Sequence, residues 1–263
     1  MARGSLSRRD FNVLEKIKDP EANPVTVVML DSNLPKDPNI TDTSVYERVS
    51  QKERDIVMAI QQLEMELAGL RPSTSMEPIK DYGRCVHELG QLISENPRYA
   101  SARNNRAQAL RRLHGDTMII SGQRDSKALI QDPDTDETSR AALTTLVDLD
   151  EAISLLTPKG SFAPISPVAS KTLSQAHTQR AAVYYMTSKS IRSDGAISLG
   201  GRKEEKWTKL DFETAASQDF ALGGRYGNEV AKGLAVSTNP TAKLCGQIVR
   251  EAMRKEYGPA FAQ

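Results

Sequence analysis

The chain has 263 residues, of which 38% are hydrophobic, 26% charged and only 5% aromatic. This composition is typical of a soluble, mainly helical protein and disfavours a β-sandwich or barrel, which uses more aromatic and β-branched residues. The 35 Lys and Arg residues balance 34 Asp and Glu residues at a formal charge of +1, so no overall positive field attracts nucleic acid or an anionic membrane.

The start of the chain and its cysteine content indicate a reducing compartment. The first ten residues, MARGSLSRRD, lack the apolar stretch of a signal peptide, and two cysteines cannot form a disulfide framework. The sequence has no run of about 18 apolar residues that would span a bilayer. We therefore expect a protein of the cytoplasm, or alternatively of the nucleus, that binds neither membrane nor nucleic acid.

Residues 1–43 are expected to form an amino-terminal arm. Apolar residues between Phe11 and Ile17 predict one short amphipathic helix, which ends at Asp19-Pro20 because proline disfavours helix in the residue before it. The β-branched stretch PVTVVML, residues 24–30, is followed by no second strand signal, so we expect it to lie extended on the helices. The alternative is a peptide-like segment that binds a partner.

From residue 44 onward the apolar residues follow helical spacing. Steps of four, three, four and three residues separate Ile56, Ile60, Leu63, Leu67 and Leu70, which predicts one long amphipathic helix. The sequence PSTS at 72–75 ends this helix, and a second helix is expected over 79–95. Further helices are predicted at about 98–113, 138–156, 167–187, 203–221, 226–237 and 240–257.

Three of these helices share a repeated stripe. Each has a small or medium residue, a large apolar residue four positions later and an apolar or small residue three positions after that, which places all three on one helix face. The stripes are Cys85/Leu89/Leu92, Thr145/Leu149/Ala152 and Thr208/Phe212/Ala215. The helices before the second and third stripes share the motifs Asn105-Arg106-Ala107 and Gln179-Arg180-Ala181, in which the alanine lets a neighbouring helix approach closely.

These features resemble the tetratricopeptide repeat, a 34-residue helix-turn-helix unit whose two helices are called A and B. Leu89 and Ala107 are 18 residues apart, the interval of an uninterrupted array. Longer intervals further on imply insertions of about 26 and 15 residues, carried by TMIISGQRDSKALIQDPDTDETS and IRSDGAISLGGRK, whose composition is that of loops. A third insertion, TPKGSFAPISPVAS, separates the second repeat from the third.

The resemblance extends to the tetratricopeptide repeat protein 36 family, through the stretches ASARNNRAQALRRLHGD, LVDLDEAISLL, LDFETAASQDFALGG and NPTAKLCGQIVREAM. It implies an all-α superhelix, or solenoid, of about three helix pairs with C-terminal capping helices. The repeat domain is then expected at 44–257, with repeats at about 44–97, 98–157 and 167–224, C-terminal helices at 226–257 and a tail at 258–263. The last helix should close the open end of the solenoid with an apolar face of Leu244, Ile248, Val249 and Ala252.

Residues with catalytic or metal-binding chemistry form no recognisable motif. The three histidines are not at metal-ligand spacing, and neither Cys85 nor Cys245 lies in a redox or catalytic signature, so we expect both thiols to be buried and structural. The acidic stretch DPDTDE lacks the glycine and terminal glutamate of a calcium loop. We therefore expect a protein that is not an enzyme and that uses no metal and no cofactor. Trp207, the single tryptophan, is expected to be partly buried in packing contacts.

The concave face of such an array, which the A helices line, commonly holds an extended peptide. Amide side chains there can bind a peptide backbone, and arginines favour acidic residues. The candidate groove residues are Asn104, Asn105, Gln108, Arg111 and Arg112 in the second repeat and Gln175, Gln179 and Tyr185 in the third. The alternative is that these are ordinary solvated residues of amphipathic helices.

The family resemblance implies an interaction with heat-shock protein 70 chaperones. Many chaperone-binding repeats grip an acidic C-terminal tail with lysine, arginine and asparagine, and of that clamp only Asn105 has a counterpart here. Gln175 and Gln179 stand in the third A helix where Lys and Arg are needed, which removes charge-assisted hydrogen bonds worth ~1.5–3 kcal/mol each. We therefore expect any chaperone contact to use a folded domain or a longer segment.

The sequence thus predicts a non-catalytic scaffold or adaptor that binds a protein or peptide partner, with a co-chaperone-like role as its specific form. The alternative is a regulatory or assembly subunit that contacts its partners through the inserted loops.

Overall fold

The computed structural model describes residues 28–160, 163–191 and 196–257. Within these ranges the secondary structure consists of eight α-helices and one short 3-10 helix, with isolated β-bridges between extended segments and no strand. The prediction of an all-α fold is confirmed. The predicted helix near residues 11–17 and the tail at 258–263 lie outside the described residues.

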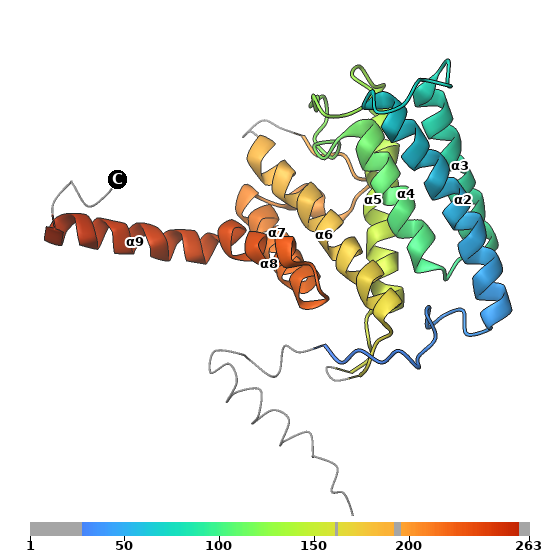
Figure 1. Cartoon of the computed structure of the whole chain (residues 1–263). Coiled ribbons are helices and arrows are strands. Elements are labelled where there is room, and N and C mark those ends of the chain that lie inside the picture. Colours follow the sequence, from blue (N-terminus) through green and yellow to red (C-terminus); the bar gives the residue numbers. More distant parts are fainter. Residues whose placement is uncertain (1–27, 161–162, 192–195, 258–263) are drawn as a thin grey trace, which may run out of the picture.

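The helices follow one another as packed pairs along the chain (Figure 1). The pairs are α2 (Thr43–Leu67) with α3 (Pro78–Glu95), α4 (Ala100–His114) with α5 (Thr135–Leu156), and α6 (Pro167–Ser190) with α7 (Lys209–Arg225). Each pair also packs on the next, through α3 on α4 and α5 on α6, and α4 contacts α6 directly. This stacking in chain order is consistent with an α-solenoid. The short helix η2 (Lys203–Lys206), α8 (Glu229–Thr238) and α9 (Pro240–Tyr257) complete the described chain.

Side-chain caps set several helix ends. Asp42, Asp134 and Ser166 accept hydrogen bonds from the first free backbone N–H groups of α2, α5 and α6. Thr208 and Asp211 form a reciprocal capping box at the start of α7. α3 and α6 each begin with a proline, which is tolerated there because the first N–H groups of a helix have no partner within it.

The first two stripes are buried as the spacing predicts. Cys85, Leu89 and Leu92 are at most 4% exposed, and Thr145, Leu149 and Ala152 have no exposed surface. The third stripe has a different register from the predicted one. Although Phe212 is buried, Thr208 is the exposed cap of α7, and the buried residues with the same spacing are Ala216, Phe220 and Gly223.

An ion pair that recurs in the second and third pairs of helices establishes this register. Arg106 Nε contacts Asp148 Oδ2 at 2.6 Å, and Arg180 Nε contacts Asp219 Oδ2 at 2.7 Å. Leu149 follows the first aspartate and Phe220 follows the second. Phe220 is therefore the counterpart of Leu149.

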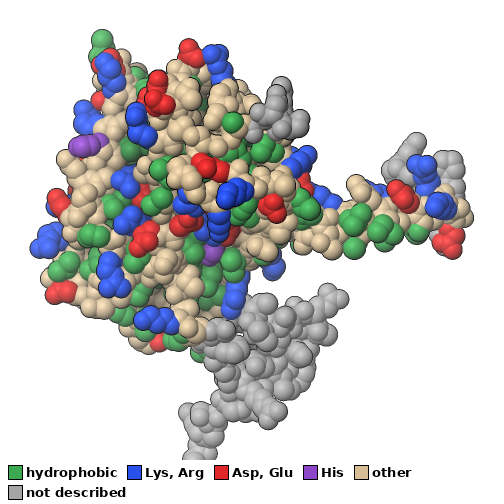
Figure 2. Space-filling view, turned by 180° about the vertical axis from the view of Figure 1, so that it is seen from behind, with side chains coloured by type: hydrophobic (Ala, Val, Ile, Leu, Met, Phe, Trp, Pro, Cys, Tyr) green, Lys and Arg blue, Asp and Glu red, His purple; other side chains and the backbone are tan. Residues whose placement is uncertain are grey.

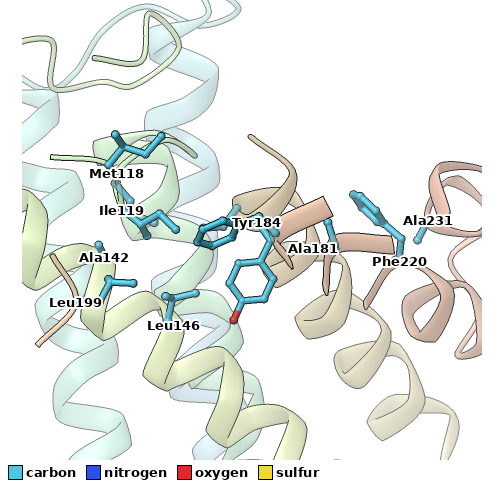
Figure 3. Close-up of a cluster of buried hydrophobic side chains, with 13 residues drawn as sticks. Met118, Ile119, Ala142, Leu146, Ala181, Tyr184, Leu199, Phe220 and Ala231 are labelled. Carbon is cyan, nitrogen blue, oxygen red and sulfur yellow. The ribbon is translucent and has the colours of Figure 1, made fainter. Parts of the chain in front are cut away.

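The inserted segments contribute side chains to the core. Met118, Ile119 and Leu199 are at most 2% exposed and pack between α5, α6 and α7 (Figure 3). Ile120 and Ile197 form an antiparallel bridge that joins the two insertions. Although the composition of these segments is that of loops, each also contains a short apolar run. These runs complete the packing of the second and third pairs of helices.

The described part of the arm, residues 28–42, lies along the connection between α5 and α6. Ile165 donates its backbone N–H to the carbonyl of Met29 at 2.9 Å and accepts from Asp31 at 3.0 Å. Further along the arm, the Asn39 side chain donates to the Leu155 carbonyl at 3.1 Å. The partner of the extended stretch is thus the third insertion, more than a hundred residues away in the sequence.

The last helix does not close the end of the stack, and this expectation is wrong. Figure 1 shows α9 projecting from the end of the stack, and its main contacts are with α7 and α8. Leu244, Ile248 and Val249 are 56%, 57% and 58% exposed. Cys245 is also exposed, which corrects the prediction that both thiols are buried. The cause lies in the one-residue link between α8 and α9, which is too short for a helical hairpin.

Candidate binding groove

An open groove of about 840 Å³ crosses the first helices of the three pairs, α2, α4 and α6. Val57, Ile60 and Met186 provide apolar side chains in its lining. The loop after α4 contributes further lining residues, among them Asp116 and Lys127. Most of the residues predicted from the sequence lie in or beside this groove, but their partners differ from those expected.

Three of the predicted residues form an amide cluster between α4 and α6. Asn104 is 1% exposed, and its Nδ2 donates to Gln175 Oε1 at 3.4 Å. Gln179 Nε2 donates to Asn104 Oδ1 at 2.8 Å and also contacts the Asn104 carbonyl at 3.2 Å. Because buried amides need partners, these bonds hold the two helices in register. Asn104 and Gln179 are therefore engaged within the protein.

Asn105 and Arg112 join α4 to α2. Asn105 Nδ2 donates to Glu53 Oε1 at 2.7 Å, and Arg112 Nε donates to Glu64 Oε1 at 2.8 Å. Arg112 also donates to the Lys127 carbonyl at 2.7 Å, which ties the inserted loop to the same side chain. Both predicted groove residues thus contact carboxylates of the neighbouring helix.

Arg111 is held in a similar way. Its guanidinium donates to both oxygens of Asp116, at 2.7 and 3.0 Å, and to Gln179 Oε1 at 3.1 Å. Each groove arginine therefore has a carboxylate of this chain as its partner. The positive charge that was expected to favour acidic peptides is neutralised inside the protein.

One glutamine from each first helix remains exposed in the groove. Gln61 on α2 and Gln108 on α4 make no side-chain hydrogen bond to any described residue, and the Nε2 group of Gln175 on α6 is likewise without a described acceptor. Each amide offers donors and an acceptor without charge. These three glutamines therefore present uncharged hydrogen-bonding groups beside the apolar side chains of the groove.

Tyr185 does not line the groove. Its ring packs edge-on against Phe220, with the ring centroids 6.4 Å apart, and Lys189 Nζ lies 5.2 Å from its centroid. The side chain belongs to the contact between α6 and α7. Trp207 is half-buried against Tyr184 and Phe212, as predicted.

A smaller pocket of about 250 Å³ lies beneath the arm, where α2 meets the starts of α4 and α6. It contains two buried carboxyls that the sequence analysis did not single out. Glu53 is 7% exposed and accepts from the Tyr99 hydroxyl as well as from Asn105, and Asp37 is 4% exposed. Burial raises the pKa of both carboxyls above their ordinary values, although hydrogen bonds oppose this effect.

The buried histidine of the third pair is structural. His177 Nδ1 lies 2.8 Å from Asp219 Oδ1, and its ring stacks on Tyr226. Burial acts to raise the pKa of Asp219, but hydrogen bonds from Arg180 and His177 outweigh it and hold the pKa below its ordinary value. Among the described residues, no three His, Cys, Asp or Glu side chains converge as a metal site. None of the described helices is both long and apolar enough to cross a membrane.

Comparison with known proteins gives two relatives. The chain is 36% identical over 260 residues to the L-tyrosine degradation gene cluster protein hmgX of Aspergillus fumigatus, a match that covers 97% of this chain and 94% of that protein. It is 29% identical over 200 residues to tetratricopeptide repeat protein 36 of Danio rerio, covering 76% and 73% of the two chains. No protein-family model matches the chain, and no solved structure does. The resemblance to tetratricopeptide repeat proteins is thus supported only at the lower identity and over the shorter match.

Proposed function

The chain belongs to the family of the L-tyrosine degradation gene cluster protein hmgX, and we propose that it is a non-catalytic scaffold or adaptor that binds a partner protein in the groove. The groove between α2, α4 and α6 carries this proposal. It spans three consecutive helix pairs, and each first helix contributes one exposed glutamine. A surface of this kind suits an extended or loop segment of another protein.

We interpret the three helix pairs as repeats of the tetratricopeptide type. The small/large/small stripe recurs as Thr145/Leu149/Ala152 and Ala216/Phe220/Gly223, and the same arginine–aspartate pair precedes the large residue in both. Similarity to tetratricopeptide repeat protein 36 supports this interpretation.

The chemistry of the groove indicates an uncharged partner segment. Arg111 and Arg112 are neutralised by Asp116 and Glu64, so an acidic segment would have to break existing ion pairs. The exposed amides can instead pair with a peptide backbone or with polar side chains, and the apolar lining can hold one hydrophobic side chain. Binding should accordingly depend little on salt.

The name of the relative narrows the choice of partner. Because hmgX is described as a protein of an L-tyrosine degradation gene cluster, we infer that the partner of this chain takes part in the breakdown of L-tyrosine, in the cytoplasm or alternatively the nucleus. An adaptor would act there by positioning or stabilising an enzyme.

Affinity capture from the native cell with quantitative mass spectrometry tests the proposal. The wild-type chain should enrich proteins of L-tyrosine breakdown, and Gln108→Arg should abolish this because it adds bulk and charge to the groove without breaking a bond within the chain. The matched control is Gln218→Arg on α7, an exposed glutamine that does not line the groove. Equal enrichment by wild type and Gln108→Arg would contradict a groove site.

A more specific version of the adaptor proposal is that the partner is a heat-shock protein 70 chaperone, which the resemblance to tetratricopeptide repeat protein 36 suggests. The groove arginines already form ion pairs within this chain and are not available to an acidic chaperone tail. We therefore propose that a chaperone binds this chain through a folded domain or a longer segment. Titration calorimetry with full-length and tail-less chaperone should then give nearly equal affinities. A tenfold weaker affinity of the tail-less form, about 1.4 kcal/mol, would show that the tail is the ligand.

A regulatory or assembly subunit that binds through its inserted loops is the alternative. Met118, Ile119 and Leu199 of these loops are buried, which leaves fewer apolar side chains for a partner. Capture that survives Gln108→Arg but is lost on changing the exposed loop residues Gln123 and Arg124 would favour this alternative.

A further inference from the structure

α9 is unable to fold back on α8. Asn239 alone separates Thr238 from Pro240, whereas helical hairpins need a connection of at least about two residues. The Asn239 side chain also accepts hydrogen bonds from the backbone N–H groups of Thr241 and Ala242, at 2.9 and 3.2 Å. Asn239 is thus the N-terminal cap of α9 and cannot also form a turn between the two helices. α9 must therefore point away from its own α8.

α9 has two different sides. Its exposed large apolar residues are Leu244, Ile248 and Val249, and Figure 2 shows hydrophobic side chains along one side of the projecting helix. The opposite side has Lys243, Gln247, Arg250 and Arg254, separated by four, three and four residues. Such a helix buries its apolar side against another surface when one is available.

The outer side of α8 is a second uncovered surface. Its inner side packs on α7, where Ala231 has no exposed surface. On the outer side, Val230 and Val236 are 71% and 69% exposed. Between them lies Gly233, where an added Cβ would meet no atom within 4 Å. The outer side of α8 therefore has two exposed valines around a glycine, next to the exposed ion pair of Glu229 and Lys232, and a helix can approach it closely at Gly233.

The two surfaces match in register. When two helices pack antiparallel about a turn, residues equally far from the turn lie opposite each other. Counted from Asn239, Ile248 lies opposite Val230 and Cys245 opposite Gly233. By the same count Val249 lies opposite Glu229, whose side chain is 81% exposed, and Arg250 is the next residue along α9. An apolar pair and a pair of small residues thus coincide, although the link prevents this contact within one chain.

We propose that two copies of this chain exchange α9, so that each α9 packs on the outer side of the other copy's α8. Exchange of an identical element is a low-cost route to a closed dimer, and short links between elements favour it. The chain has a formal charge of only +1, so two copies do not repel each other strongly. The interface is separate from the groove, and groove substitutions such as Gln108→Arg leave it intact.

Sedimentation velocity of the full-length chain tests the dimer. We expect dimers in the micromolar range, and we expect Ile248→Glu and Val236→Glu each to raise the dissociation constant about tenfold or more, because each places a charge in an apolar contact. Both side chains are exposed in the single copy, so the helical content of these variants should not change. Gln247→Glu is the matched control, since it adds the same charge to the other side of α9, and it should remain dimeric.

Lengthening the link tests the exchange itself. About four residues inserted between Asn239 and Pro240 would allow α9 to fold back on its own α8, and this variant should be monomeric. A wild-type chain that is monomeric at about 100 µM would overturn the dimer. A dimer that persists in the lengthened variant or in Val236→Glu would overturn the exchange.

Discussion

Buried ion pairs fix the register of the helix pairs at the level of single residues. Asp148 has no exposed surface and accepts from both Arg103 and Arg106, at 3.1 and 2.6 Å. Asp219 is bound in the same way by Arg180 and His177. A buried pair adds little net stability, because desolvation offsets the attraction, but the loss of one partner leaves an unpaired charge.

Asp148→Asn should therefore destabilise the protein by ~3–5 kcal/mol, the range for breaking a buried ion pair. Urea unfolding monitored by circular dichroism measures the change. The control is Asp132→Asn, which removes an ion pair with Arg124 whose side chains are 74% and 83% exposed, and which should change stability little. Equal effects of the two substitutions would contradict the structural role of Asp148.

Glu53 should give the stability a distinct pH dependence. Because burial raises the pKa of this carboxyl, the folded state binds its proton more readily than the unfolded state does. Its contribution to stability is present below the unfolded pKa of about 4.3 and is lost as pH rises through the higher folded pKa.

The wild-type chain should therefore lose more unfolding free energy than Glu53→Gln as pH rises from about 4.3 to 7. Urea unfolding of both proteins across this range measures the difference. Asp37, whose pKa is also raised by burial, is present in both proteins and repels the Glu53 carboxylate, so the comparison measures Glu53 together with this interaction. Parallel pH profiles would show that Glu53 does not titrate in a buried site.

The candidate groove could be predicted in part from residue types. Polar residues on the inner helices indicated its place, and Gln108 and Gln175 are exposed there. The partners of the other residues could not be predicted, because Asn105 pairs with Glu53 and Arg112 with Glu64 across 52 and 48 residues of sequence. No local pattern contains such contacts, so Asn105 and Arg112, which residue type alone assigns to a ligand, are engaged within the protein.

Helices were the elements best predicted from sequence, since apolar spacing and Asn-Pro or Asp-Pro pairs are local signals. Spacing alone does not determine the register of the stripe in α7, because Thr208/Phe212/Ala215 and Ala216/Phe220/Gly223 both follow it. The capping box uses Thr208 at the start of the helix. The repeated Arg and Asp residues were visible in the sequence and are the signal that distinguishes the two registers.

Leu149→Ala should cost ~2–5 kcal/mol and Phe220→Ala ~3–5 kcal/mol, because both side chains are buried in packed stripes. Val147→Ala is the control on the same helix as Leu149, since Val147 is 45% exposed. Thermal and urea unfolding provide the comparison. If Phe220→Ala were as mild as Val147→Ala, the register given by the arginine–aspartate pairs would be wrong.

The inserted segments and α9 depend on contacts that local composition does not encode. Glycine, aspartate and serine indicated loops at 117–139, yet Met118 and Ile119 within that stretch are buried between helices. The apolar spacing of α9 predicted a helix correctly but not its position. The position of α9 is set by its one-residue link to α8, which prevents the helix from folding back even though its apolar face is uncovered.

For the whole molecule, the groove lies on the first helices of the three pairs, whereas α9, with its exposed apolar side, projects from the far end of the stack (Figure 1). These surfaces differ in chemistry, so they suit different contacts. The groove offers uncharged amides for a segment of another protein, and α9 offers an apolar side for a second copy.

The central claim is that a partner protein binds in the groove, and hydrogen exchange of the full chain with and without its captured partner tests it most directly. We predict slower exchange in α2, α4 and α6, whose side chains line the groove, with little change in the second inserted segment at 196–202, none of whose residues lines the groove. Slower exchange confined to that inserted segment, with α2, α4 and α6 unchanged, would contradict the account.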